Sequence, residues 1–224
     1  MDDIVQEQLA YYRARALEYD ESLQGRRRAL GDRADAQVRD EIARARDALR
    51  RLGSVEAVLE LACGTGRWTR ELLGMARRIT AVDGAPEMLA MARAKVGGAA
   101  AVDFICADLF GWVPTSQYDL VMFAAWISHI PPHRLDEFLD KVRDAVRPGG
   151  HVFIVDEPAG GQEFSGPLEG AMYQTRPLRD GRRFKIVKVY YETDVICEKL
   201  RARGFGHVRA ETGQYFFHVT GTRL

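Results

Sequence analysis

Short apolar runs alternate with amphipathic stretches along most of the chain from residue 55 onward. The runs are rich in β-branched residues, which is typical of strands buried on both faces, and the stretches between them repeat apolar residues at helical spacing. This alternation predicts an α/β fold with a mostly parallel sheet covered by helices on both faces. The expected strands are residues 55–61, 78–82, 102–107, 118–124 and 151–156.

Proline and glycine mark where the expected helices begin and end. Pro86 and Pro132 follow strands and suit the first turn of a helix, where a missing N–H costs nothing. The run Arg-Pro-Gly-Gly at 147–150 stops another helix before the fifth strand. These signals agree with the apolar periodicity.

The region after the fifth strand differs in composition and in periodicity. Residues 157–182 are rich in Gly, Pro and Arg and show little periodicity, so we expect a long loop that acts on the substrate or as a lid. An added strand over 183–191 and a helix over 193–203 should follow it. Residues 207–211 and 214–222 then predict a terminal antiparallel hairpin.

The N-terminal region differs again, because it contains no proline and is rich in Arg, Ala, Glu and Asp. Apolar residues at helical spacing predict two helices there, broken near Gly25 and Gly31. We therefore expect residues 1–52 to form a helical lid segment and residues 53–224 to form one core domain.

Composition narrows the function classes. Lys and Arg total 32 and Asp and Glu also total 32, so no net positive field favours nucleic acid or a membrane surface as partner. The three cysteines show no paired spacing, which argues against disulfides and a metal site and favours the reducing cytoplasm. No leader-like or membrane-length apolar stretch is visible. We expect a soluble protein that acts on a small molecule, and the sequence leaves its oligomeric state open.

A glycine-containing turn, Glu60-Leu-Ala-Cys-Gly-Thr-Gly66, follows the first expected strand. Its small side chains let a ligand approach backbone N–H groups at a helix N-terminus. A dinucleotide site would place a third glycine where Thr69 stands. The acidic Glu60 at the strand end suits a cationic amino group instead, because opposite charges attract strongly in a partly desolvated cleft.

Carboxylates also end the next two strands. Asp83 is placed to accept hydrogen bonds from a ribose diol, and Asp108 to accept one from an adenine amino group. Leu109 could offer its backbone amide to the ring. Any one of these carboxylates could equally be a solvating group at a strand end, but three at successive strand ends favour a ligand site.

Five segments together resemble a class I methyltransferase: ELACGTG, AVDGAPEMLAMA, CADLF, YDLVMFAAWISHIP and RPGG. The resemblance covers residues 55–156, and YYRARALEYD at 11–20 resembles the helix that covers the cofactor in many bacterial members. It implies S-adenosyl-L-methionine as cofactor and a Rossmann-like seven-stranded, mostly parallel sheet with a terminal antiparallel hairpin.

The resemblance also implies which residues hold the cofactor. Glu60, Gly64 and Gly66 correspond to the methionine end, Asp83 to the ribose, and Asp108 with Leu109 to the adenine. Met88 packs on the adenine or ribose, or else is a core methionine. The other expected cofactor contacts are Ala62, which replaces a frequent family glycine, Gly84 and Ala124, with Tyr11, Arg15 and Tyr19 on the covering helix.

Acceptor chemistry should lie near the end of the fourth strand. His129 follows that strand and is a candidate general base, or alternatively a histidine that caps the next helix. Trp126 either walls the acceptor pocket or belongs to the core. Lys188 shares an apolar strand face with Ile186 and needs a partner, which is either an anionic substrate or a carboxylate such as Asp156 or Glu157.

The segments LRDGR and FKIVKV, with YYRARALEYD, are similar to a phosphonate O-methyltransferase. That resemblance implies a phosphonate-holding lysine, matched by Lys188, and a tyrosine at a position where Arg26 or its neighbours stand. The arginines of the preceding loop either add positive charge near Lys188 or form a solvated face, as charge runs usually do; they are Arg176, Arg179, Arg182 and Arg183.

The sequence therefore predicts an S-adenosylmethionine-dependent methyltransferase that acts on a small anionic metabolite, with oxygen the favoured acceptor atom over nitrogen or carbon. His129 and Lys188 are the candidate catalytic residues. The alternative is a noncatalytic protein that binds the same cofactor to sense or to scaffold.

Overall fold

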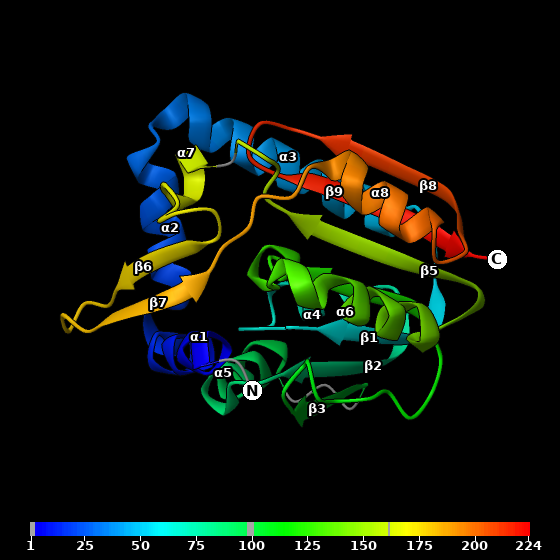
Figure 1. Cartoon of the computed structure of the whole chain (residues 1–224). Helices are drawn as coiled ribbons and strands as arrows, with labels where there is room; N and C mark the ends of the chain where they lie inside the picture. The colour runs from blue at the N-terminus through cyan, green and yellow to red at the C-terminus, as the bar shows by residue number, and fades with distance from the viewer. Residues whose placement is uncertain (1–2, 98–100, 161) are drawn as a thin grey trace.

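The computed structural model describes residues 3–97, 101–160 and 162–224. Its centre is a seven-stranded sheet of order β3-β2-β1-β4-β5-β9-β8 (Figure 1). Strands β1 to β5 run parallel, and β9 pairs antiparallel with both β5 and β8. The expected fold class is thus confirmed. The strands are β1 Val55–Leu61, β2 Ala76–Asp83, β3 Val102–Cys106, β4 Tyr118–Ala124, β5 Val146–Asp156, β8 Phe205–Thr212 and β9 Phe217–Arg223.

Helices cover both faces of this sheet. α6 and α8 pack on one face, and α3, α4 and α5 pack on the other. None of the helices in the described residues combines the length and apolar composition that crossing a membrane requires. The helices are α1 Asp3–Ala14, η1 Ala16–Glu18, α2 Tyr19–Ala29, α3 Asp32–Arg50, α4 Arg67–Leu72, α5 Pro86–Val96, η2 Ile127–His129, α6 Pro132–Ala145, α7 Gln162–Ser165 and α8 Thr193–Arg201.

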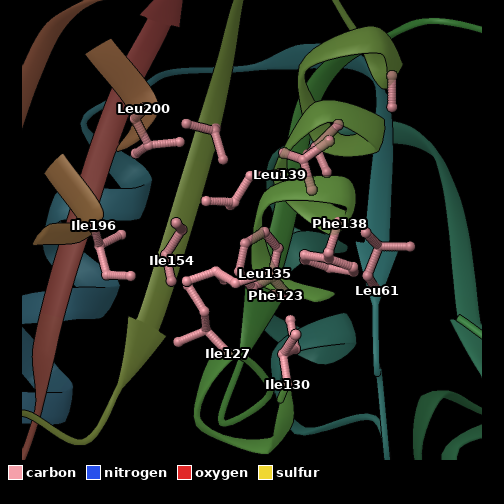
Figure 2. Packing of buried hydrophobic residues seen from close by; sticks show 14 of the residues in the cluster. Leu61, Phe123, Ile127, Ile130, Leu135, Phe138, Leu139, Ile154, Ile196 and Leu200 are labelled. Atoms are coloured by element: carbon pink, nitrogen blue, oxygen red, sulfur yellow. The ribbon is translucent and has the colours of Figure 1, made fainter. Parts of the chain in front are cut away.

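Strand β4 shows why a continuous apolar run becomes the centre of the sheet. Successive side chains of a strand point to opposite faces, so one run serves two cores. Val121 and Phe123 belong to the core under α6 and α8, whereas Leu120 and Met122 belong to the core under α3 to α5. Phe123 meets Phe138 of α6 edge to face, with ring centroids 5.3 Å apart (Figure 2). This rigid centre positions the loops at the carboxyl ends of β1 and β4.

The region expected to be a long loop is partly structured. It contains α7 and a further strand, β6 (Tyr173–Pro177), which pairs antiparallel with β7 (Arg183–Val187) in a separate two-stranded sheet. The loop prediction was wrong there, because β6 is polar and lacks an alternation that periodicity could detect. The strand expected over 183–191 ends at Val187.

The N-terminal segment is helical, as expected, but its breaks differ from the prediction. The break at Gly31 is present, where φ is +84°, a value that favours glycine. Gly25 lies inside α2 without a break, so that prediction was wrong. The other break falls at Arg15, where α1 gives way to η1.

Helix α1 is fastened to the hairpin strand β7. The buried Gln8 side chain donates to the His129 carbonyl oxygen (3.1 Å) and accepts from the Val187 N–H (3.1 Å). In Figure 1, α1, α2 and the β6–β7 hairpin lie together beyond one end of the sheet. The N-terminal helices and the β6–β7 hairpin, which are far apart in sequence, therefore lie together at this end of the sheet.

Candidate functional site

Two adjoining hollows lie between the carboxyl ends of the central strands and the N-terminal helices. The first, which we call the apolar cleft, has a volume of about 730 Å³ and is lined by residues such as Leu9, Met88, Leu109 and Trp126. The second, which we call the arginine chamber, is lined by residues such as Arg15, Arg26 and Arg176. Both hollows share the following lining residues: Tyr12, Tyr19, Ala62, Gly64, Ala124, Ala125 and His129.

The turn after β1 forms the floor between the hollows. Ala62, Gly64 and Gly66 all have positive φ, at +55°, +53° and +77°. A Cβ on Gly66 would come within 3.0 Å of Ala92 on α5, so this glycine permits the close packing of α4 and α5. Ala62 takes a left-handed conformation at a position where the family often has glycine. That conformation strains the backbone of any residue with a Cβ, so alanine in place of glycine differs in backbone strain as well as in side-chain size.

Asp83, at the end of β2, holds this turn in place. Its Oδ2 accepts from the Gly64 N–H at 2.8 Å, and its Oδ1 accepts from the Ala85 N–H at 2.9 Å. Burial raises the pKa of the Asp83 carboxyl, and these backbone donors oppose the shift. Each oxygen keeps a second lone pair that a diol in the apolar cleft could use.

Glu60 lies in the arginine chamber beneath the same turn. It is 3% exposed, and its Oε2 accepts a 2.6 Å hydrogen bond from the Thr69 hydroxyl. Burial raises the pKa of the Glu60 carboxyl to about 8, and Asp83 adds to that rise. A cation beside Glu60 would restore the ionised form, so the site fits an ammonium group. Thr69, which breaks the dinucleotide pattern, is the hydrogen-bond partner of Glu60.

One part of the apolar cleft is lined by Asp108 and by apolar side chains. Asp108 accepts from the Phe110 N–H at 3.0 Å, while Met88 and Leu109 supply apolar walls. Trp126, expected either to wall the acceptor pocket or to belong to the core, lines the apolar cleft but not the arginine chamber, and its ring centroid is 5.5 Å from that of Phe110. Its Nε1 is buried and has no partner among the described residues.

The N-terminal helices cover both hollows. Gly84 also lines the cleft, and a Cβ there would come within 3.0 Å of Leu9, so α1 packs directly on the end of β2. Tyr12 and Tyr19 line both hollows, whereas Tyr11 packs away from them against the hairpin residue Phe184. Tyr11, expected to contact the cofactor, therefore does not line either hollow, whereas its neighbour Tyr12 does. Helical spacing allowed either tyrosine to face inward.

His129 lies where the hollows meet, and both of its ring nitrogens are bound. Nδ1 is 2.7 Å from the Val187 carbonyl oxygen, which can only accept, so Nδ1 carries the proton. Nε2 then accepts from the Tyr12 hydroxyl at 2.8 Å. Burial, with the charges of Lys188 and Arg176, holds the pKa of His129 well below its ordinary range, so the ring is neutral.

Lys188 is buried behind the arginine chamber, with 1% of its side chain exposed. Its Nζ lies 3.1 Å from Glu157 Oε1 and donates to the Ser128 hydroxyl, also at 3.1 Å. Of the two carboxylates expected as partners, Glu157 is the one in contact. Glu157 lines the chamber and Lys188 does not. Lys188 therefore affects the chamber through its ion pair with Glu157.

Seven arginines of the described residues line the chamber: Arg15, Arg26, Arg27, Arg39, Arg46, Arg67 and Arg176. Of the loop arginines, Arg176 does not belong to a solvated face. Arg176, on β6, is only 9% exposed, because the unexpected hairpin turns it inward. Its guanidinium donates to the Gln174 side chain, that of Arg26 donates to the Ser165 hydroxyl, and that of Arg15 lies 4.7 Å from the Tyr19 ring centroid. Among the described residues, no carboxylate forms an ion pair with these three arginines.

Sequence comparison identifies a methyltransferase domain over residues 58–150. The chain is 38% identical over 98 residues to trans-aconitate 2-methyltransferase of Streptomyces avermitilis, and 32% identical over 151 residues to that of Escherichia coli K12. These matches cover 42% and 66% of this chain, and the chain spans only 36% and 57% of those two relatives.

Solved structures match over the whole chain. A DhpI–SAM–HEP complex superposes with a TM-score of 0.80 and 38% identity, covering 99% of this chain and 98% of DhpI. A DhpI–SAH complex gives a TM-score of 0.79 and 37% identity, covering 99% and 97%. These complexes confirm S-adenosylmethionine as the cofactor and the resemblance to the dehydrophos phosphonate O-methyltransferase. The N-methyltransferase NodS of Bradyrhizobium japonicum, at 15% identity, shares the fold.

Glu60 near the end of β1 lines the arginine chamber, while Asp83 at the end of β2 and Asp108 shortly after β3 line the adjoining apolar cleft, and that arrangement is compatible with the amino group, ribose and adenine of S-adenosylmethionine. With whole-chain similarity to DhpI added, the chain belongs to the class I S-adenosylmethionine-dependent methyltransferases.

Proposed function

We propose that this protein transfers a methyl group from S-adenosylmethionine to an oxygen of a small anionic metabolite bound in the arginine chamber. The main observation behind this proposal is that Arg15, Arg26 and Arg176 make their hydrogen bonds to neutral groups. Burial lowers the pKa of Arg26, and the charges of Arg176 and Arg15 lower it further. An anion between these cations would relieve both penalties.

The chamber is placed correctly for such an acceptor. Glu60, expected at the amino end of the cofactor, lines the chamber, and the residues shared by the two hollows lie between it and the apolar cleft. A cofactor held by Glu60 at one end and by Asp83 and Asp108 at the other would extend from one hollow into the other, with the cationic wall beside its methionine end. The three arginines also line an outer groove beside α7 and the hairpin, which gives anions a route inward.

An oxyanion acceptor requires little catalytic assistance from the side chains of the protein. Bound S-adenosylmethionine supplies an electrophilic methyl group on a positively charged sulfur. The acceptor oxygen attacks the methyl carbon, a C–O bond forms as the C–S bond breaks, and the sulfur keeps the electron pair. No proton moves, so alignment and exclusion of water are the main contributions of the chain. His129, neutral and bound by Tyr12, then positions the covering helix rather than removing a proton.

The relatives support an anionic acceptor. Trans-aconitate carries carboxylates, and two of the similar proteins are named for methylating it. We further propose that residues 1–52 form the lid expected from the sequence, and that residues 157–182 form the acceptor side of the site. The three cysteines are free, which supports a reducing compartment such as the cytoplasm.

Charge-removing variants test the proposal. Arg26→Gln and Arg176→Gln should each raise the KM for a small carboxylate or phosphonate acceptor about tenfold or more, because each removes a charge-assisted hydrogen bond. The Kd for S-adenosylmethionine, measured by calorimetry, should stay within about twofold. Arg182→Gln is the matched control, because Arg182 lies on the same hairpin but is exposed and paired with Asp180.

Two results would overturn the proposal. A neutral acceptor that is methylated faster than any anion would assign the arginines another role. Cofactor binding without turnover on a broad panel of carboxylates and phosphonates, trans-aconitate included, would favour the noncatalytic sensor instead.

A further inference from the structure

Glu157 lines the arginine chamber and carries one buried oxygen that has no partner among the described residues. The residue is 6% exposed and lines the chamber near Phe164 and Arg176. Its Oε1 accepts from the Ser165 hydroxyl at 2.7 Å and lies 3.1 Å from Lys188 Nζ. Its Oε2 is buried and has no hydrogen-bond partner among the described residues. A buried carboxylate oxygen left in this state costs free energy unless a ligand or solvent satisfies it.

The pairing with Lys188 makes this oxygen compatible with an anion. A free carboxylate would repel an anionic acceptor, but the buried lysine compensates the charge of Glu157. What remains is Oε2, a strong hydrogen-bond acceptor on a residue that lines the cationic chamber. The chamber therefore offers guanidinium donors on one side and a lone acceptor on another.

A ligand that satisfies both features must carry an anionic group and a hydrogen-bond donor. Carboxylates and fully ionised phosphonates are acceptors alone, so they match the arginines but not Oε2. A hydroxyl group near the anionic group supplies the missing donor. The hydroxyl can be a C–OH or the P–OH of a singly ionised phosphonate.

We propose that Glu157 Oε2 selects acceptors that carry a hydroxyl group next to their anionic group. This inference rests on the proposed function, because it takes the arginine chamber as the acceptor site. It assigns Glu157 as a specificity-determining residue and Lys188 as the residue that positions it. Lys188, which the sequence led us to expect in contact with the substrate, thereby acts on the substrate indirectly, through Glu157.

Pairs of isosteric anions test the inference by binding, without requiring turnover. Glycolate is compared with propionate, and hydroxymethylphosphonate with ethylphosphonate, because each pair exchanges only a hydroxyl for a methyl group. Calorimetry on the full chain saturated with S-adenosylhomocysteine should show the hydroxylated anion binding about tenfold or more tightly, as expected for a hydrogen bond to a charged group. Ethylphosphonate at pH 6 and pH 9 separates a P–OH donor from a C–OH donor.

Glu157→Gln adds a test of the residue itself. Lys188 can only donate, so it holds the amide oxygen of the glutamine, and the amide NH₂ then replaces Oε2. The preference for the hydroxylated anion should fall to within about twofold of unity. Ser165→Ala is the matched control. Ser165 donates to Oε1 of Glu157 and accepts from Arg26, so its removal can change the affinity for both anions of a pair, but the preference between them should survive.

The outcomes separate the two proposals. Equal binding of both members of each pair to the wild-type protein overturns the role of Glu157 while leaving the anionic acceptor intact, even if the glutamine variant fails to fold. An unchanged preference in Glu157→Gln overturns it as well. If neither member binds at millimolar concentration while S-adenosylhomocysteine does, the anionic acceptor itself is wrong, and the inference fails with it.

Discussion

The Tyr12 hydroxyl lies 2.8 Å from Nε2 of His129 and joins the first helix to the loop after β4. The two residues are 117 positions apart, and both lie where the two hollows meet. The hydrogen bond requires the neutral imidazole, since a protonated Nε2 could not accept from the hydroxyl. Protonation of His129 would therefore loosen the helix that covers the site.

His129 should make the protein less stable in acid. Its pKa in the folded state lies far below the unfolded value near 6.5, because burial and the nearby charges of Lys188 and Arg176 disfavour the charged ring. Stability is complete above that unfolded pKa and falls as the pH drops below it, by about 1.4 kcal/mol per pH unit for one such group. Urea unfolding of wild type and His129→Asn from pH 7.5 to 5 should show a shallower loss in the variant. Equal slopes would contradict the buried, neutral assignment.

Glu60 should show the opposite dependence, and it should couple to the cofactor. Its folded pKa of about 8 exceeds the unfolded 4.5, so the ligand-free protein loses stability as the pH rises from 4.5 through 8. Glu60→Gln removes that loss and should unfold at higher urea concentration than wild type at pH 8. It should also bind S-adenosylmethionine at least about tenfold more weakly, because an ion pair with the amino group is gone.

Proton release gives an independent measure of Glu60. A bound ammonium lowers the pKa of the carboxyl, so binding at pH 7 should release protons from wild type. Calorimetry in two buffers of different ionisation enthalpy measures that number. The same proton count in Glu60→Gln would show that the released proton comes from another group.

The strands that carry the predicted cofactor residues could be placed from the sequence because their determinants are local. Glu60 and Asp83 lie at the ends of β1 and β2, Asp108 follows β3, and parallel strands bring their carboxyl ends to one edge. β1 and β4 begin and end where the pattern predicted. Such features depend on neighbours in the chain rather than on distant contacts.

The proposed acceptor side of the site could not be predicted from the sequence, because contacts between residues far apart in the chain create it. Arg176 looked like one member of a solvated charge run until β6 paired with β7 and turned it inward. Lys188 was correctly expected to need a partner, but the choice of Glu157 over Asp156 depends on how the chain turns after β5. Tyr12 and Tyr11 are adjacent, and only the position of β7 decides which one faces the cleft.

A polar latch should control how fast the lid opens. Lys95 on α5 donates to Asp20 on α2 and to the Thr65 hydroxyl at 2.8 Å, and Thr65 donates to Asp20 at 3.0 Å. Asp20→Asn removes the charge that holds these three segments together. S-adenosylhomocysteine should then dissociate several-fold faster in stopped-flow measurements, because local opening becomes easier.

The exposed pair between Arg13 and Glu87 supplies the control for the latch. It also links the N-terminal helices to α5, but its side chains are 52% and 43% exposed, so solvent screens it. Arg13→Gln should leave the dissociation rate within about twofold of wild type. Equal acceleration by both variants would indicate general loosening of the segment rather than a latch.

Glu41 should be the main anchor of the N-terminal segment on the core. This buried carboxylate of α3 accepts hydrogen bonds from the N–H groups of Gln214, Tyr215 and Phe216, at 2.8 to 2.9 Å, in the turn between β8 and β9. Glu41→Ala leaves three backbone donors without their acceptor and should cost about 2–4 kcal/mol of unfolding free energy in urea titrations. Asp40→Ala, one position away, removes an exposed pair with Arg44 and should cost less than about 0.5 kcal/mol. If both substitutions cost the same, the turn satisfies its N–H groups in another way, and α3 is held to the sheet by its apolar face alone.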